Sequence, residues 1–410
     1  MDKSKKYIKL ISLLIVFLGI ISILISYIFT FEFIEIYIDD DQHIGAHVAP
    51  RIYLFNQQMF YLGIFVFLIG IIFFLKKNSI SKFVKKQKNF SPKIILLFVT
   101  FVLIIIIGEL VARFVFGNAL DKEFGESPGR EKFMKSISYN SDGFRDYEFL
   151  VEKNNPRIIV LGDSFTFGVG IENFSDTFPK KSEAKFAANN ISVEVYNLGI
   201  QGYSTFDQLE TLRSKGMKYD PDLVVVGFFL NDFEGEESRE EFKHLFYGHI
   251  TYPYEIGAFL RAKSYLFYFF ESRIFKILDA YNLRKTYVDY LNSLYKDKKQ
   301  LEDHKKSFNE IVDLTEQRNA SVVVLIFPVI TDFSNYPLSN LHNQVKSIAK
   351  ERNVCVIDFL EVFKDQDPKS LLVSSFDSHM NEKAHEIVGE ELTNFLIKMS
   401  FPKNKKISCH

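Results

Sequence analysis

The 410-residue sequence has no tryptophan, only two cysteines, and a formal net charge of −1. A chain with so little net charge lacks the positive field that attracts phosphate, so we expect no nucleic-acid partner. No group of cysteines and histidines has zinc-ligand spacing, and we expect neither a metal nor an organic cofactor. Cys355 lies in an apolar, strand-like run and Cys409 in a polar tail. Their spacing leaves open whether they pair.

Long apolar runs are abundant, and they are concentrated near the N-terminus at about 8–29, 59–75 and 94–116. A helix needs ~20 predominantly apolar residues to cross the hydrocarbon core, which the first and third runs provide and the second approaches. The first run is too long for the core of a signal peptide and lacks a convincing cleavage site. We therefore predict a membrane domain over residues 1–116 with three transmembrane helices.

The distribution of basic residues predicts the orientation of these helices. Four lysines stand at or just before the start of the first run, and seven lysines without an acidic residue lie between positions 76 and 93. The loop after the first run carries five acidic residues against Arg51 alone. The N-terminus is thus predicted to be cytoplasmic, and everything after residue 116 extracytoplasmic, in a multi-pass protein of the cell (inner) membrane. Glu109 and Arg113 are interpreted as an ion pair near the outer end of the third run.

Beyond residue 156, short β-branched runs alternate with helical patterns. The runs at 158–161, 192–197, 223–230, 321–327 and 353–359 predict five strands of a parallel sheet. We expect a connector at 117–156 that packs on this domain, the domain itself at 157–400, and a polar tail at 401–410. An aromatic-rich insertion at about 233–306 is too long for an ordinary loop. We interpret it as a helical cap over the site, with a surface resting on the membrane as the alternative.

Polar residues and glycines follow the predicted strands at their carboxyl ends, where open α/β sheets bind ligands. Ser164 follows the first strand in a Gly-Asp-Ser tripeptide, Gly199 follows the second strand, and Asn231 follows the third. Asp377 and His379 precede the last predicted helix. Taken alone, Ser164 fits the N-cap of a helix equally well.

Together these five residues supply every group that acyl transfer needs. Ser164 is the predicted nucleophile and His379 the predicted general base, and Asp377 is predicted to fix the histidine tautomer. The N–H groups of Ser164 and Gly199 and the side-chain amide of Asn231 are predicted to form an oxyanion hole.

The Gly-Asp-Ser tripeptide, Gly199, Asn231 and His379 stand in the order of the SGNH (GDSL-type) hydrolases, which the chain resembles over roughly residues 157–396. The resemblance implies a flavodoxin-like, three-layer α/β/α domain and serine-dependent ester hydrolysis or acyl transfer. Phe229 stands where the family usually has glycine, and Gly227 comes earlier. The Asp-x-His spacing resembles that of polysaccharide O-acetyltransferase-type members.

The sequence therefore predicts a membrane-anchored, extracytoplasmic serine esterase that cleaves O-acyl esters, with acetyl esters of an envelope or secreted glycan as the expected substrate. Two alternatives stay open. The first is a polysaccharide O-acetyltransferase that receives acetyl from a separate acyl-donor membrane protein. The second is a catalytically silent binding or scaffold protein with the same fold. The lipid bilayer and an acylated small molecule or glycan are the expected partners.

Other polar residues are assigned structural roles from the sequence. Arg145 is predicted to form a salt bridge, and Asp163 to shape the turn before Ser164. His385 is predicted to lie on the surface of the last helix, and His244 and His249 to be solvated within the insertion.

Overall fold

The computed structural model describes residues 3–28, 49–86, 92–120, 133–135, 137–235, 254–281, 283, 286–374, 377–407 and 409. The chain divides into two compact units, Met1–Gly117 and Asn118–His410. Each unit is described by itself.

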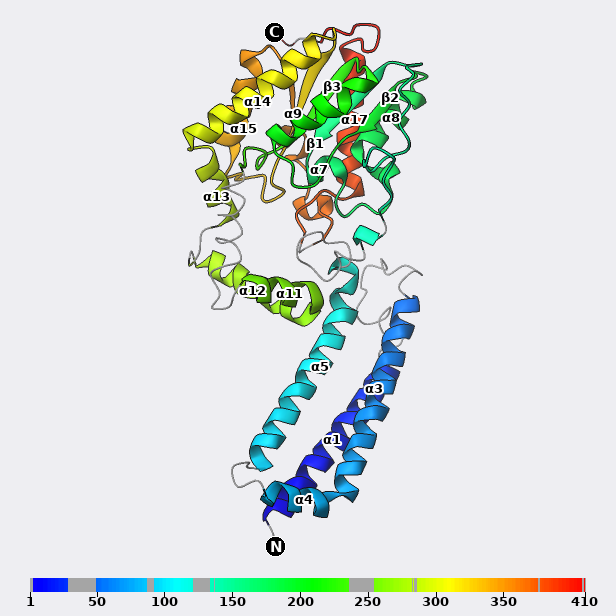
Figure 1. The fold of residues 1–410 in the computed structure, drawn as a ribbon, viewed down its shortest axis with the longest axis vertical. Coiled ribbons are helices and arrows are strands. Elements are labelled where there is room, and N and C mark those ends of the chain that lie inside the picture. Colours follow the sequence, from blue (N-terminus) through cyan, green and yellow to red (C-terminus); the bar gives the residue numbers. More distant parts are fainter. Residues whose placement is uncertain are drawn as a thin grey trace. The chain divides into compact units, whose positions relative to one another are not determined.

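The first unit consists of helices coloured blue to cyan in Figure 1. They are α1 (Lys3–Ile28), α3 (Ala49–Leu75), α4 (Lys77–Lys86) and α5 (Pro92–Leu120). Among the described residues, two segments are long and apolar enough to cross a membrane, Lys6–Leu24 and Leu97–Val115. The apolar stretch of α3 is shorter, at Gly63–Leu75. Two of the three expected spans thus meet the criterion by length and composition, and the span at 59–75 stays a prediction.

Helices α1 and α3 approach each other closely through glycine. A Cβ atom on Gly19 would lie 2.7 Å from the backbone nitrogen of Phe67, and one on Gly63 would lie 2.9 Å from the carbonyl oxygen of Gly19. Small residues at such crossings let helix backbones pack where no hydrophobic effect drives association. Near the end of α5, Arg113 Nε donates to Glu109 Oε1 at 2.8 Å, which confirms the expected pair.

The second unit is built on a five-stranded parallel sheet with the order β2-β1-β3-β4-β5. The strands are β1 (Arg157–Gly162), β2 (Glu194–Asn197), β3 (Leu223–Phe229), β4 (Ser321–Phe327) and β5 (Cys355–Asp358). This is the flavodoxin-like order, in which the chain reverses direction across the sheet between β1 and β3. All residues of β1 and β3 are buried, as expected for central strands covered on both faces.

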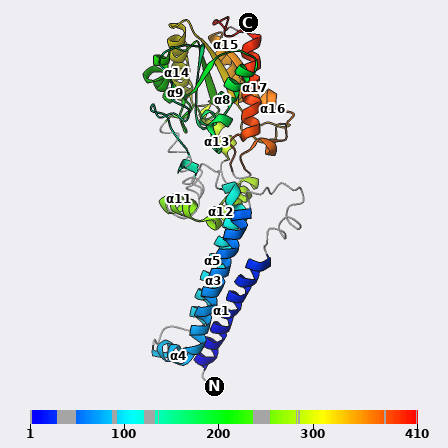
Figure 2. The same ribbon diagram turned by 90° about the vertical axis from the view of Figure 1, so that its right-hand side faces the viewer.

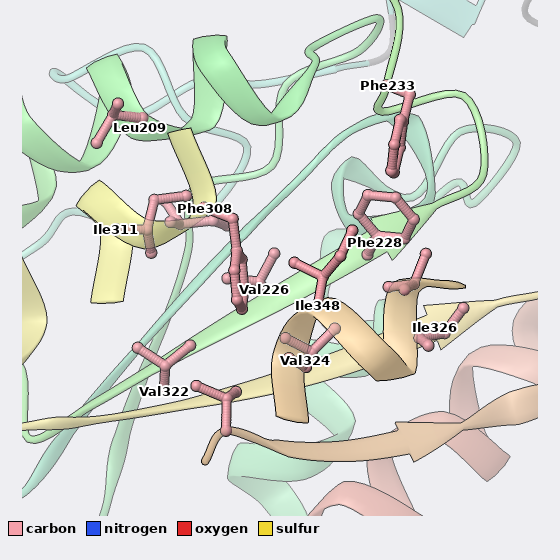
Figure 3. Packing of buried hydrophobic residues seen from close by; sticks show 14 of the residues in the cluster. Leu209, Val226, Phe228, Phe233, Phe308, Ile311, Val322, Val324, Ile326 and Ile348 are labelled. Atoms are coloured by element: carbon pink, nitrogen blue, oxygen red, sulfur yellow. The ribbon is translucent and has the colours of Figure 1, made fainter. Parts of the chain in front are cut away.

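Helices cover both faces of the sheet, as the two views in Figures 1 and 2 show. One face carries α9 (Thr205–Ser214), α14 (Lys298–Glu316) and α15 (Ser339–Glu351), and the other carries α8 (Phe178–Ala188), α16 (Phe359–Phe363) and α17 (Glu382–Lys398). Figure 3 shows the first face, where Phe308 and Ile348 pack over Val226 and Val324. The three-layer α/β/α fold is thereby confirmed.

The other described helices of the second unit are α7 (Ser164–Phe167), η2 (Phe174–Asp176), η3 (Gly216–Tyr219), α11 (Tyr254–Lys263), α12 (Tyr265–Ala280), α13 (Tyr287–Leu294) and η4 (Pro368–Leu371). The expected insertion is helical in its described part. On α12, Phe270, Ile274 and Ile277 are exposed along one face. His244 and His249 lie outside the described residues, and the role of the insertion as a cap stays a prediction.

The C-terminal segment is fixed to the sheet by a disulfide bond. Cys355, in β5, is bonded to Cys409, which settles the question that the spacing leaves open. Phe401 and Ile407 are buried, so the segment after α17 packs on the domain although its composition is polar.

Candidate active site

Ser164 begins a four-residue helix, α7, that follows β1 directly. Gly162 at the end of β1 lies opposite Gly227 of β3, and the side chain of Thr166 fills the space that the two glycines leave. A Cβ atom would lie 2.0 Å from Thr166 Oγ1 if placed on Gly162, and 2.3 Å if placed on Gly227. The glycine pair therefore lets the helix that carries Ser164 rest on the end of the sheet.

Gly199, after β2, has the same close contact with α7. A Cβ atom on Gly199 would lie 2.5 Å from the backbone nitrogen of Phe167. The Gly199 N–H donates to Asn197 Oδ1 at 2.9 Å, and Asn197 Nδ2 donates to the carbonyl oxygen of Thr166. The structure thus gives Gly199 a packing role, and its N–H already has a partner. Its role as an oxyanion donor stays a prediction.

Phe229, the departure from the family pattern, supports the site through aromatic packing. Its ring stacks on Phe165 with centroids 4.1 Å apart, and the Phe165 ring lies 5.2 Å from the imidazole of His379. Gly227, which precedes the position where the family usually has glycine, faces Gly162 across the sheet.

Asp163 shapes the turn into α7, as expected from the sequence. Its side chain caps the helix by accepting a hydrogen bond from the Phe165 N–H at 2.9 Å, and Ser164 Oγ lies 3.4 Å from its other oxygen. Burial raises the pKa of Asp163 to about 6, against a partial lowering by that N–H and by the charge of His379. A cap with this pKa is half ionised at about pH 6 and carries its full negative charge only well above that pH.

Ser164, His379 and Asp377 form a continuous hydrogen-bonded chain. Ser164 Oγ lies 2.9 Å from His379 Nε2, although the two residues are 215 positions apart in the sequence. His379 Nδ1 lies 2.5 Å from Asp377 Oδ1, which also accepts the backbone N–H of His379 at 2.9 Å. The one-residue spacer therefore lets Asp377 hold both the ring and the backbone of the histidine.

The pKa of His379 is raised above its ordinary value. Burial lowers it, but the charge and hydrogen bond of Asp377, together with the charge of Asp163, raise it by more. A base with a raised pKa binds the proton of a hydroxyl more strongly, which suits removal of the Ser164 proton.

Two donors of the predicted oxyanion hole have no partner within the described part of the chain. No hydrogen bond is formed by the Ser164 N–H at the start of α7 or by the side-chain amide of Asn231, whose Oδ1 is buried. Asn231 follows β3 at the same edge of the sheet as Ser164. Both groups can therefore bind a developing oxyanion without first breaking a hydrogen bond.

Two structural assignments from the sequence are wrong. Arg145 is buried and forms no salt bridge in the described part of the chain. Its guanidinium donates to backbone carbonyls at the end of α7 and directly after it, those of Phe167, Gly168, Ile171 and Glu172. His385 is buried rather than on the surface. Its Nδ1 accepts the Phe178 N–H at 3.0 Å, and burial lowers its pKa to about 3.

Arg145 and Asn197 are thus residues of the site's framework that the sequence did not reveal, because each acts on backbone atoms of a segment distant in the chain. No group of three or more histidine, cysteine or acidic residues suited to a metal occurs among the residues that the structure describes.

A parallel sheet with a serine, a histidine and an aspartate hydrogen-bonded in series at its carboxyl edge defines a serine hydrolase-type site. Residues 160–387, more than half of the chain, match the GDSL-like lipase/acylhydrolase family. The chain belongs to this family, and it is an SGNH-type enzyme that acts on ester bonds. No curated protein matches it.

Solved structures of esterases and of a lipase/acylhydrolase also resemble the chain. A psychrotrophic esterase from Pseudoalteromonas sp. is 16% identical, with 60% of this chain and 98% of that chain covered and a TM-score of 0.36. A lipase/acylhydrolase from Enterococcus faecalis is 16% identical, with 59% and 95% covered and a TM-score of 0.36. An acetylxylan esterase from Geobacillus stearothermophilus is 15% identical, with 63% and 100% covered and a TM-score of 0.37.

Proposed function

We propose that the protein is a membrane-anchored, extracytoplasmic serine esterase that removes O-acyl groups, acetyl in particular, from an envelope or secreted glycan. The observation that carries the proposal is the hydrogen-bonded series of Ser164, His379 and Asp377. In this proposal Ser164 is the nucleophile, His379 the general base, and Asp377 the group that orients it.

The reaction begins with attack of Ser164 Oγ on the ester carbonyl carbon while His379 Nε2 takes the hydroxyl proton. The tetrahedral oxyanion is bound by the Ser164 N–H and the Asn231 amide, with Gly199 as a further donor if its N–H leaves Asn197. Collapse breaks the ester C–O bond, and the His379 proton goes to the departing alcohol. Water, activated by the same histidine, then releases the acid and restores Ser164.

Two features support the membrane and extracytoplasmic parts of the proposal. The first unit has two helices that are long and apolar enough to anchor the chain, and the lysines between positions 76 and 93 favour the cytoplasmic side for that loop. The Cys355–Cys409 disulfide is typical of an oxidising compartment, since cytosolic thiols are kept reduced.

The test is release of acetate from an acetyl aryl ester and from an acetylated oligosaccharide by the full-length protein in detergent. We expect activity that Ser164→Ala and His379→Ala each reduce by at least about 10³-fold. The matched control is Ser175→Ala, which changes a serine in the nearby η2 turn whose contacts do not involve the triad.

Each outcome separates the alternatives. Activity that survives Ser164→Ala refutes the mechanism. Transfer of acetyl to an added oligosaccharide in preference to water identifies an O-acetyltransferase, the function that the Asp-x-His spacing resembles. A properly folded protein without activity on any ester supports the scaffold alternative.

A further inference from the structure

The segment before β1 contributes two adjacent buried side chains to the loops of the active site. Arg145 is 3% exposed and Asp146 is 6% exposed, and both lie upstream of residue 160, where the family match begins. Arg145 reaches the end of α7, the helix that carries Ser164. Asp146 reaches Asn197, whose side chain holds Gly199. One dipeptide outside the matched region thus contacts two of the segments that form the site.

Helix α7 is too short to be stable by itself. It consists of the single turn Ser164–Phe167, and helices this short do not form in isolation, because nucleation fixes several residues for one hydrogen bond. Asp163 caps its N-terminus. At the C-terminus, the last carbonyl groups of a helix have no donor within the helix and must find one elsewhere. The orientation of Ser164 therefore depends on the donors that hold these carbonyls.

Arg145 supplies most of these donors. Its Nη1 donates to the carbonyl oxygen of Phe167 at 3.3 Å and to that of Gly168 at 2.6 Å. Its Nη2 donates to the carbonyl oxygens of Ile171 and Glu172, the latter at 3.2 Å. One planar guanidinium, with its donors in a fixed fork, thus holds both the end of α7 and the loop that follows it.

The charge of Arg145 is held by these carbonyls and by two aromatic rings. The guanidinium carbon lies 5.6 Å from the ring centroid of Phe133 and 5.4 Å from that of Phe167. Burial lowers the pKa of Arg145 to about 10, so the side chain stays charged at neutral pH. A cation at the C-terminus of a helix is favourable, because the carbonyl end of the helix dipole is negative. Removal of the guanidinium would leave buried carbonyl oxygens without that donor.

Asp146 holds a second loop of the site through Asn197. Asp146 Oδ2 accepts the Asn197 N–H at 2.9 Å, and its Oδ1 lies 3.1 Å from Nζ of Lys180, which is also buried. The Asn197 side chain accepts the Gly199 N–H and donates to the carbonyl oxygen of Thr166. Because Thr166 belongs to α7, the contacts of Arg145 and Asp146 converge on the same helix.

The backbone that presents this dipeptide is itself fixed. Asn140 Oδ1 accepts the Phe144 N–H at 2.9 Å, and the Asn140 N–H donates to the Phe144 carbonyl oxygen at 2.8 Å. Phe144 is fully buried in the core on one face of the sheet. Arg145 and Asp146 are therefore anchored at the backbone as well as at their side-chain ends, as residues that position a site must be.

We propose that Arg145 and Asp146 are positioning residues of the ester-cleaving site, a clamp that aligns Ser164 with its oxyanion donors by acting through α7 and Asn197. The inference rests on the proposed function for the reaction, and it places the start of the functional domain before this clamp and not at residue 160. Misalignment of a nucleophile affects the transition state more than substrate binding, so loss of the clamp should lower kcat with little change in KM.

The test compares Arg145→Ala with Arg157→Ala in the full-length protein in detergent. Arg157 is the matched control, a fully buried arginine at the opposite end of β1 that donates to the carbonyl oxygens of Tyr219 and Glu152 and pairs with Glu194. Both variants should be less stable than the wild type. On the acetyl aryl ester, we expect only Arg145→Ala to lower kcat, by at least about tenfold, with KM unchanged. Guanidinium chloride at a non-denaturing concentration should restore part of this loss in Arg145→Ala alone.

Hydrogen exchange gives a reading that needs no activity and tolerates milder variants. Arg145→Lys keeps the charge but lacks the fork that reaches both groups of carbonyls. The N–H groups of Gly168 and Val169 donate to the Ser164 carbonyl oxygen, each at 3.1 Å. In Arg145→Lys these two N–H groups should exchange at least about tenfold faster than in the wild type, because the helix opens more often. Arg157→Lys should leave their exchange unchanged.

The second arm of the clamp has its own control. Asp222 is a buried aspartate at the other end of the sheet, and its Oδ2 accepts the Arg157 N–H at 2.8 Å, as Asp146 accepts that of Asn197. Asp146→Ala should lower kcat with KM unchanged, whereas Asp222→Ala should affect stability alone.

Three results overturn the inference: an unchanged kcat in folded Arg145→Ala, an equal loss of kcat in Arg157→Ala, or unchanged exchange of the Gly168 and Val169 N–H groups in Arg145→Lys. Failure of the proposed function has a different signature, since it would be seen in the wild type as ester cleavage that is absent or independent of Ser164. In that case the exchange comparison decides by itself whether Arg145 holds α7.

Discussion

Removal of the Cys355–Cys409 disulfide should destabilise the second unit strongly. The bond joins residues 54 positions apart. In the chain-entropy description, opening a loop of this length raises the conformational entropy of the unfolded chain. The unfolded state is thereby stabilised by about 4 kcal/mol relative to the folded state. For a domain of this size that corresponds to a fall in Tm of roughly 10 °C.

The assay is thermal unfolding of the detergent-solubilised protein, oxidised and reduced, compared with Cys409→Ser. Reduced wild type and the variant should unfold at the same lowered temperature, and the reductant should have no effect on the variant. Lys406→Ser is the matched control, because it changes an exposed residue of the same segment and leaves the bond intact.

Two results would refute the reasoning. Equal Tm values for the oxidised and reduced protein would show that the bond contributes nothing to stability. Two free thiols in protein isolated from cells under alkylating conditions would show that the bond does not form there, which would also remove one support for an extracytoplasmic location.

Three further predictions concern the site and the first unit. Asp377→Asn should lower kcat by about 10³–10⁴-fold and move the acid limb of the pH profile to lower pH, because the pKa of His379 is raised by Asp377 and activity requires the neutral ring; an unmoved limb would contradict this. Gly227→Ala should lower the free energy of unfolding by about 1–3 kcal/mol, because the new methyl group would lie 2.3 Å from Thr166 Oγ1. Gly235→Ala is the control: its methyl group would meet no atom within 4 Å, and stability should be unchanged. Gly63→Leu should separate α1 from α3 and make the first unit more sensitive to proteolysis, which Leu68→Ala, at an exposed position, should not do.

The sequence was sufficient for the sheet because each strand is a short, β-branched run bounded by turn residues. The predicted run at 321–327 coincides with β4, and the others differ from their strands by one or two residues at either end. The strand order follows from the parallel crossovers together with the family resemblance. The described residues of the insertion are helical, and α13 packs Tyr290, Leu291 and Leu294 into the core. The exposed apolar face of α12, by contrast, does not indicate which surface it covers.

The sequence predicts those residues of the candidate site whose type suits acyl-transfer chemistry and whose position follows a predicted strand or precedes a predicted helix. Ser164 and His379 were identified in this way, and the structure places them within hydrogen-bonding distance. Contacts with backbone atoms were not predictable, because any segment offers the same carbonyl and N–H groups. The carbonyl contacts of Arg145 and the bond from the Gly199 N–H to Asn197 are of this kind.

The disulfide between Cys355 and Cys409 encloses two of the three triad residues in one covalently closed loop. The segment that the disulfide closes begins in β5, passes through α16 and η4, contains Asp377 and His379, and ends after α17. His379, the proposed general base, thus stands inside a covalently closed loop, whereas Ser164, the proposed nucleophile, lies outside it on α7. The hydrogen bond between Ser164 Oγ and His379 Nε2 joins these two parts. A change that loosens the closed loop therefore displaces His379 before it displaces Ser164. We therefore expect the bond to stabilise the relative position of Ser164 and His379 as well as the fold.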